Sequence, residues 1–318
     1  MNSNYLKIHP WKIIEEDFDP TRVKSSESIF SLGNGTMGQR ANFEETYTGD
    51  TFQGSYVGGI YYPDKTRVGW WKNGYPEYFA KVLNAPNWIG IDIRVNDTVL
   101  DLNRCKSVLN FRRELDMRSG IYTRSFEAQI DSNCKIGIEV KRFLSMDENS
   151  LGVIHYQITA LEGNCVLSID SYIEGKITNQ DSNWDDPFWN HLSALHSNDL
   201  MVLKSQTCKT AFDVATFAQT HIITPQGEMV SDFESSSKDF HISQSKKQKL
   251  TEGEQCAILK FGGYINGVNH PPETFESKAK RLVENAKIKG IETLIKEQKV
   301  AWSAIWENSD IEIHGDEA

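Results

Sequence analysis

The segment at residues 179–190 has the residue types of a ligand-binding site: three Asp, three Asn and two Trp lie within it. Carboxylate and amide groups can bind the hydroxyls of a sugar, while an aromatic ring packs on its apolar face. The candidate contacts to a substrate or to a neighbouring domain are Trp184, Asp185, Asp186 and Trp189. The alternative is a self-packed connection in which Asn and Asp form turns. The spacing of the three Asp is not that of an EF-hand calcium loop.

A second motif, at residues 33–38, matches GxGxxG. In a dinucleotide-binding fold this motif joins a strand to a helix whose N-terminus holds the pyrophosphate. A strand is expected just before the motif, but the residues after it are short and turn-rich, so no such helix is expected. We favour a glycine-rich bend between two strands. A further interpretation is that this bend carries Arg40, Glu44 and Glu45 toward a functional surface.

The residues of the chain do not single out a catalytic set. No Ser-His-Asp pattern, P-loop or HExxH motif occurs, and the eight His have no metal-ligand spacing. A glycosidase-like carboxylate pair cannot be chosen among 44 acidic residues. The five Cys are odd in number and widely spaced, which favours free buried thiols in a reducing compartment. The residues alone therefore leave a catalytic set unassigned, and we expect no metal and no cofactor in this chain.

Another aromatic run, at residues 70–78, contains Trp70, Trp71, Tyr75 and Tyr78. The favoured interpretation is that these rings pack beneath a loop, and the alternative is that they contact a ligand.

Composition excludes several classes of partner. The net charge of −10 argues against nucleic-acid binding and against docking on anionic membranes. No stretch approaches the roughly 18 apolar residues of a membrane span, and no secretory leader is visible, so a cytoplasmic location is expected. At 318 residues with 39% hydrophobic residues, the chain can bury a large core.

Many short strands must position these motifs. Residues 91–95 and 136–140 alternate apolar and polar side chains, the period of a half-buried strand. Many strands with few helices between them predict an all-β sandwich. The serine- and lysine-rich residues 235–238 and 245–247 are expected to be hairpin tips. Strands are expected at 29–32, 88–95, 99–102, 120–130, 135–143, 152–160, 165–173, 200–205, 212–223, 229–235, 239–243 and 254–264.

The pattern becomes helical after about residue 270. A first helix is expected at 274–289, with Gly290 as its C-cap or as a hinge, and a second at 291–307. The second helix places Trp302 and Trp306 on one apolar stripe. This stripe needs a partner surface, which either the sandwich or a missing domain supplies.

Three segments together resemble glycoside hydrolase family 65. Residues 31–45 resemble its N-terminal GNG…G.RG..EE signature, with Ala41 in place of the usual Gly. Residues 181–189 resemble the NEDSNYDE.FW stretch of the maltose phosphorylase branch, from which Gln180, Trp184 and Asp186 depart. Residues 301–316 resemble the linker of the family. The resemblance covers essentially the whole chain, in order.

This resemblance implies a fold and an activity. Residues 1–270 would form a large antiparallel β-super-sandwich of the galactose mutarotase-like kind. Residues 271–318 would be a helical linker leading to an (α/α)6-barrel catalytic domain that the chain does not reach. Most members use inorganic phosphate as a co-substrate to split α-glucosides such as maltose, and others are hydrolases. The general acid and the phosphate ligands belong to the barrel, and the full-length enzyme is expected to form a homodimer.

The expected function is therefore that of a non-catalytic front domain, cut just before its catalytic domain and inactive alone. Its sugar-contact or domain-contact candidates are those named above, with Arg40 and Glu44 on the bend. One alternative is a stand-alone carbohydrate-binding module that uses Trp184 and Trp189 as its platform. Another is a mutarotase-like enzyme, which rests on fold analogy alone because no His–carboxylate pair is evident.

Overall fold

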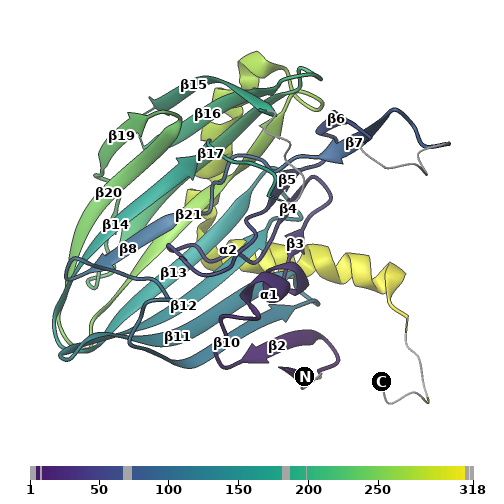
Figure 1. Cartoon of the computed structure of the whole chain (residues 1–318). Coiled ribbons are helices and arrows are strands. Elements are labelled where there is room, and N and C mark those ends of the chain that lie inside the picture. Colours follow the sequence, from purple (N-terminus) through teal and green to yellow (C-terminus); the bar gives the residue numbers. More distant parts are fainter. Residues whose placement is uncertain are drawn as a thin grey trace.

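One large antiparallel sheet dominates the molecule (Figure 1). The computed structural model describes residues 5–7, 9–66, 74–180, 187–197, 199–311 and 315. Within these residues eleven strands join this sheet, and β18 (Met229–Val230) pairs at its side with β17. The other strands, in spatial order, are β1 (Leu6–Lys7), β2 (Lys12–Glu16), β10 (Ser107–Asp116), β11 (Ile121–Asp131), β12 (Cys134–Leu144), β13 (Gly152–Glu162), β21 (Gln255–Asn266), β17 (Asp213–Ile223), β16 (Leu200–Thr207) and β15 (Trp189–Ser197).

A second, five-stranded sheet packs on the inner side of the first. Two small sheets, of three and two strands, complete the β structure of the described residues. The expectation of a mainly β fold built from large antiparallel sheets is confirmed. The five-stranded sheet has the order β19 (Glu234–Lys238), β20 (His241–Leu250), β14 (Cys165–Glu174), β8 (Ile91–Val95) and β9 (Thr98–Val99). The small sheets are β3 (Leu32–Gly33), β4 (Met37–Gln39) and β5 (Ser55–Val57), and β6 (Tyr61–Lys65) with β7 (Tyr78–Val82).

The core between the sheets follows from the two-residue period of the strands. Phe126 on β11 faces inward, and so do Ile93 on β8 and Ile169 on β14. All three belong to one buried cluster. Removing a side chain of this size from water contributes about 1.5–3 kcal/mol, so this alternation stabilises the sandwich.

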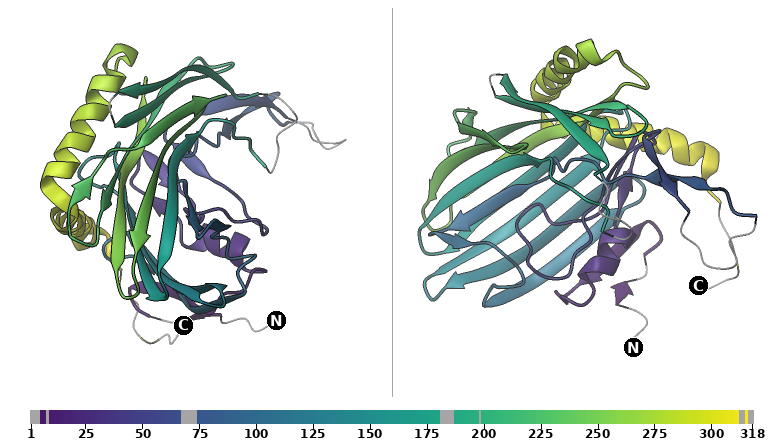
Figure 2. Two further views of the ribbon diagram at one scale, coloured as in Figure 1. Left: turned by 90° about the vertical axis from the view of Figure 1, so that its left-hand side faces the viewer. Right: turned by 45° about the horizontal axis from the view of Figure 1, so that its top comes forward.

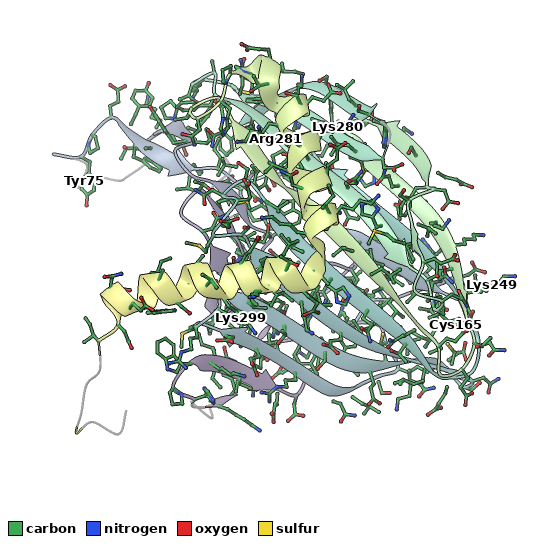
Figure 3. The ribbon with its side chains drawn as sticks, turned by 180° about the vertical axis from the view of Figure 1, so that it is seen from behind. Tyr75, Cys165, Lys249, Lys280, Arg281 and Lys299 are labelled. Atoms are coloured by element: carbon green, nitrogen blue, oxygen red, sulfur yellow. The ribbon has the colours of Figure 1, made fainter. Side chains whose placement is uncertain are left out.

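The long helix α2 (Phe275–Ser309) covers the outer face of the large sheet (Figures 2 and 3). Its buried residues Phe275 and Leu282 pack with Phe217 on β17 and Phe261 on β21. A kink divides the helix at Gly290, where φ is 71° and ψ is 162°. The two expected helices and the hinge between them are confirmed. Among the described residues, no helix is both long enough and apolar enough to cross a membrane.

The tryptophan stripe on the second half of α2 lies against the sandwich. The indole N–H of Trp306 donates to the carbonyl of Met117 at 3.0 Å. Its ring lies edge-on to Trp11, with 5.1 Å between centroids, and stacks with Trp302 at 6.0 Å. The partner surface that the stripe requires is therefore the N-terminal edge of the sandwich.

Three local expectations are wrong. Residues 29–32 are not a strand, because helix α1 (Val23–Ile29) occupies this region and β3 begins only at Leu32. Val23, Ser26, Glu27 and Phe30 are buried with the three- and four-residue spacing of a helix face. Neither serine- and lysine-rich segment is a hairpin tip. Residues 235–238 belong to β19, where Ser236 pairs with Ser243 on β20. Residues 245–247 lie inside β20, where Ser245 pairs with Asp170 on the neighbouring β14.

Candidate functional site

The β6–β7 hairpin projects from the body of the sandwich (Figures 1 and 2). It exposes an unusual concentration of large side chains, which we call the hairpin patch. Tyr75 is the most exposed of its aromatic residues, at 55%, and Figure 3 shows it at the tip of the projection. Trp70 and Trp71 lie outside the described residues, but Tyr75 and Tyr78 do not pack beneath a loop as expected. The patch consists of Tyr61, Tyr75, Tyr78, Phe79 and Val82.

Trp189 lies at the base of this hairpin and is buried, with 8% of its surface exposed. Its indole N–H donates to the carbonyl of Asn84 at 2.8 Å. The ring of the preceding Phe188 contacts that of Tyr62, with 4.6 Å between centroids. Trp189 is therefore an anchor for the segment and cannot serve as a flat platform for a sugar. The candidates Trp184, Asp185 and Asp186 lie outside the described residues.

The residues that precede the candidate loop also bond to the end of β7. The backbone N–H of Asn84 donates to the side-chain oxygen of Asn179 at 2.9 Å, and the Asn179 amide donates to the carbonyl of Val82 at 2.9 Å. The Asn84 amide also donates to the carbonyl of Thr178 at 3.1 Å. Both flanks of residues 181–186 are therefore fixed to the end of β7, below the hairpin patch.

Glu44 lies inside the molecule rather than on a surface. Its two oxygens accept separate hydrogen bonds at 2.7 Å, from the guanidinium groups of Arg124 and Arg142. Arg124 also pairs with Glu45, and all four of these side chains are buried. Burial, with the adjacent Glu45 carboxylate, raises the pKa of Tyr156 well above its ordinary value. The Glu44 carboxylate thus has no access to a ligand and fixes the bend to β11 and β12.

Arg40 connects the same bend to α1 and the following loop. Its guanidinium donates to the carbonyls of Phe52 at 2.7 Å and Lys24 at 2.9 Å, and it stacks on the ring of Phe52 at 4.9 Å. These contacts occupy the cation. Of the six candidates, the structure therefore describes Arg40, Glu44 and Trp189, and it does not bring them into one site.

The GxGxxG segment is a bend between β3 and β4, which pair with each other. Gly35 has a φ of 86°, a value that favours glycine. Asn34 holds the bend together, because its side-chain oxygen accepts the N–H of Met37 at 2.9 Å and its amide donates to the carbonyl of Ser145 at 2.8 Å. The motif runs directly into strand β4 and not into a helix, so the interpretation as a bend is confirmed.

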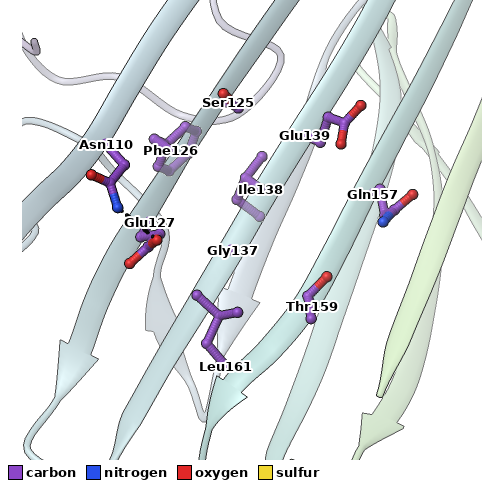
Figure 4. A pocket seen from close by; sticks show the side chains of 10 residues that line it. All are labelled: Asn110, Ser125, Phe126, Glu127, Gly137, Ile138, Glu139, Gln157, Thr159 and Leu161. Atoms are coloured by element: carbon purple, nitrogen blue, oxygen red, sulfur yellow. Dashed lines mark hydrogen bonds between the residues drawn. The ribbon is translucent and has the colours of Figure 1, made fainter. Parts of the chain in front are cut away.

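Among the hollows that the described residues border, two lie on the faces of the sheets. The larger, about 730 Å³, lies on the five-stranded sheet. The smaller, about 250 Å³, lies on the outer face of β11–β13 (Figure 4), where Gly137 has no side chain to fill it. Polar groups around the smaller hollow bond each other, as Asn110 does with Glu127 at 2.8 Å. Within the described part of the chain, no cluster of three or more His, Cys, Asp or Glu could hold a metal ion.

The family model for glycosyl hydrolase family 65, N-terminal domain, matches residues 13–305. This chain belongs to that family. Over its whole length the domain is 34% identical to maltose phosphorylase of Bacillus subtilis, of which it covers 41%. It is 25% identical, again over its whole length, to α,α-trehalose phosphorylase of Thermoanaerobacter brockii, of which it covers 42%. The chain thus spans about two fifths of the length of these curated relatives.

A solved structure shares the fold of this family 65 domain. It is that of a putative kojibiose phosphorylase from human microbiome, with a TM-score of 0.84 and 24% identity. The match covers 95% of this chain and 39% of that one.

Sequence reasoning found only part of the hairpin patch of this domain: it noted Tyr75 and Tyr78 but favoured their packing beneath a loop. The further sequence signal is a pair of aromatic dipeptides, Tyr61 with Tyr62 and Tyr78 with Phe79, that flank residues 63–77. The hairpin pairs Tyr61 with Val82 and Tyr62 with Lys81. Alternate residues of a strand face opposite sides, so Tyr62 is buried while Tyr61 is exposed. Tyr78 and Phe79 are both exposed, because neither side of the hairpin is covered at that point.

Proposed function

We propose that this domain is the non-catalytic N-terminal part of a family 65 phosphorylase that splits an α-glucoside, with maltose as the first choice, using inorganic phosphate. One observation carries the proposal: the chain aligns from end to end with only 41% of a maltose phosphorylase. The catalytic chemistry then belongs to the rest of the polypeptide. The five free thiols suit the reducing cytoplasm in which we place the enzyme.

In this proposal the domain supports the catalytic barrel through the hairpin patch. Exposed aromatic groups gathered on a projection are typical of a surface that is covered in an assembly. The base of the projection is rigid, because Asn84, Asn179 and Trp189 bond across it. A rigid base allows the patch to contact the barrel without a large loss of conformational entropy on docking.

The second half of α2 acts as the linker in this proposal. Because Trp306 is bonded to Met117 and packs on Trp11, the direction in which the helix leaves the sandwich is fixed. The domain would therefore hold the barrel at a defined orientation rather than on a flexible tether.

The test is phosphorolysis by the full-length polypeptide and by the 318-residue chain. Each is incubated with maltose, trehalose, kojibiose or nigerose and inorganic phosphate, and glucose 1-phosphate is measured. We expect turnover by the full-length protein and none by this chain. In the full-length protein, Tyr78→Ala with Phe79→Ala should lower kcat/KM at least about tenfold, since positioning contacts commonly contribute a factor of this size.

A matched control is Val166→Ala, which removes an exposed apolar side chain from β14, outside the hairpin patch. It should leave kcat/KM unchanged. Release of glucose 1-phosphate by the 318-residue chain would contradict the non-catalytic role. Full activity of the hairpin variant would contradict the role of the patch.

A further inference from the structure

The larger hollow of the domain is a groove on the solvent-facing side of the five-stranded sheet. Its floor is formed by β8, β14 and β20, which lie side by side in Figure 1, and residues 232–234 form a wall. Its volume is about 730 Å³. The groove lies on a different sheet from the hairpin patch, so the proposed function does not account for it.

The strand register arranges the side chains of this floor in two rows. In the first row Asp170 on β14 lies opposite Asp92 on β8 and opposite Ser245 on β20. In the second row, two residues back along β14, Ser168 lies opposite Arg94 and Lys247. The rows are separated by about 7 Å, the rise of two residues in an antiparallel strand. One row therefore presents carboxylates and the other presents cations.

The first row places the carboxylates of Asp92 and Asp170 directly opposite each other. Like charges placed directly opposite each other on paired strands are destabilising. Burial raises the pKa of Asp92, and the charge of Asp170 raises it further. Thr46 donates to Asp92 and Ser245 donates to Asp170, each at 2.7 Å. These bonds orient the carboxylates and leave further acceptor positions on each of them.

Neither carboxylate forms a salt bridge with a cation among the described residues. The buried Lys260 does not bond to either carboxylate, because its ammonium donates instead to the carbonyls of Gly90 at 2.7 Å and Tyr172 at 2.9 Å. Its charge reaches Asp92 and Asp170 only at longer range. The pair thus retains two anionic acceptors, side by side, for which the fold supplies no salt bridge.

The cations of the second row also lack salt bridges among the described residues. Arg94 and Lys247 are exposed, flank Ser168, and form no salt bridge within the described residues. The other cation of the groove, Lys246, is occupied by Asp232 at 2.5 Å. A guanidinium and an ammonium on either side of a hydroxyl are the groups that bind a phosphate.

We propose that the groove binds a sugar monophosphate. The phosphate would lie over Ser168, between Arg94 and Lys247, and sugar hydroxyls would donate to Asp92 and Asp170. A hexose 1-phosphate carries its phosphate and its ring hydroxyls at opposite ends of one small molecule, so it can span both rows at once. Phe233, on the wall, offers an apolar side to the ring.

The first probe is glucose 1-phosphate, a choice that rests on the proposed function because it is the product of phosphorolysis. Titration calorimetry of the 318-residue chain at constant ionic strength would compare it with glucose and with inorganic phosphate. We expect glucose 1-phosphate to bind at least tenfold more tightly than either fragment. The double change Arg94→Gln and Lys247→Gln should reduce its affinity to that of glucose.

The variant Asp170→Asn tests ligand binding without an expected loss of stability. It removes the like-charge contact with Asp92, so the folded chain should be as stable as the parent or more stable. It should nevertheless lower the affinity for glucose 1-phosphate to that of inorganic phosphate. The matched control is Lys249→Gln, which removes an exposed charge from the same face of β20, two residues beyond Lys247 and outside the groove. It should change neither the stability of the chain nor its affinity for glucose 1-phosphate.

Three results would overturn the proposal. Equal affinity for inorganic phosphate and glucose 1-phosphate would show a surface anion site without a sugar subsite. Equal affinity for glucose and glucose 1-phosphate would show a sugar groove without a phosphate subsite. If the calorimeter detected no binding of glucose 1-phosphate, glucose or inorganic phosphate, the groove would not be a binding site for any of them. If glucose 1-phosphate bound to this chain but the full-length protein showed no phosphorolysis, the proposed function would be refuted. The proposal that the groove binds a sugar phosphate would still be supported.

Discussion

Glu44 shows how a single residue can join parts of the chain that are far apart in sequence. It belongs to the N-terminal bend, yet its carboxylate bridges Arg124 on β11 and Arg142 on β12. Each of these side chains is fully buried. A buried charge that loses its partner is much less stable than a surface charge, because water cannot replace the lost contact.

We therefore expect Glu44→Ala to lower the free energy of unfolding by about 3–5 kcal/mol. Arg142 would lose its ion pair, whereas Arg124 would retain Glu45. Urea unfolding followed by tryptophan fluorescence measures the change. The matched control is Glu139→Ala, which removes an exposed carboxylate 3.4 Å from Lys141 and should change the stability by less than about 1 kcal/mol. Similar losses in both variants would contradict the buried role of Glu44.

The candidate site was predictable from the sequence only in part. The GxGxxG bend could be assigned because the residues after it cannot form the required helix, which is a local property. The burial of Glu44 could not be predicted, because its partners Arg124 and Arg142 are brought near it only by the completed sheet. Trp189 likewise suggested an exposed platform, and its burial depends on the distant Asn84.

At the scale of elements, the kink divides α2 into a half that seals the large sheet and a half that carries the tryptophans. Gly290 takes φ 71° and ψ 162°, a conformation that is open to glycine almost alone. An added Cβ would meet no atom within 4 Å. The requirement for glycine is therefore one of backbone conformation and not of space.

Gly290→Ala should destabilise the chain by about 1–3 kcal/mol, the usual range for a residue held in such a backbone region. A straightened helix would also pull Trp306 away from Met117, so its fluorescence should shift toward that of a solvated indole. Thr293→Ala, at an exposed position of the same helix, serves as the control. A variant that matches this control in stability and emission would show that the kink tolerates a side chain.

The elements that sequence patterns predicted well are those whose signal is local. β11, β12 and β13 alternate over eleven residues each, and their predicted bounds lie within two residues of the observed ones. Helix α1 was missed because its seven residues are too short to show a clear period. Residues 245–247 looked like a turn because β20 is polar on both faces at that point, and only its pairing with β14 identifies it as a strand.

The stability of the whole molecule should depend on pH through His221. This imidazole is completely buried on β17, and neither ring nitrogen has a hydrogen-bond partner among the described residues. Burial, with the nearby Lys287 of α2, lowers its pKa to about 4, and Asp199 opposes that shift only partly. The folded chain therefore keeps the ring neutral at a pH where the unfolded chain already protonates it.

The sign of the effect follows from proton uptake. Between about pH 6.5 and pH 4 the unfolded chain binds the extra proton, so the free energy of unfolding falls as the pH falls, by about 1.4 kcal/mol per unit. Urea unfolding at pH 7 and pH 5 measures this slope. His221→Leu should reduce it, while His9→Gln, at an exposed position, should not. An unchanged slope in His221→Leu would contradict the assignment.

The position of β21 has a consequence for biosynthesis. This strand is the last of the sandwich to leave the ribosome, yet it lies in the middle of the large sheet, between β13 and β17. Until residues 255–266 emerge, the nascent chain holds two half-sheets with long unpaired edges, the kind of surface on which strands of other chains aggregate. Because α2 follows directly, the strand that closes the sheet and the helix that seals it are translated together. Assembly of the domain should thus be a late event in translation, one that depends on chaperones to guard the open edges.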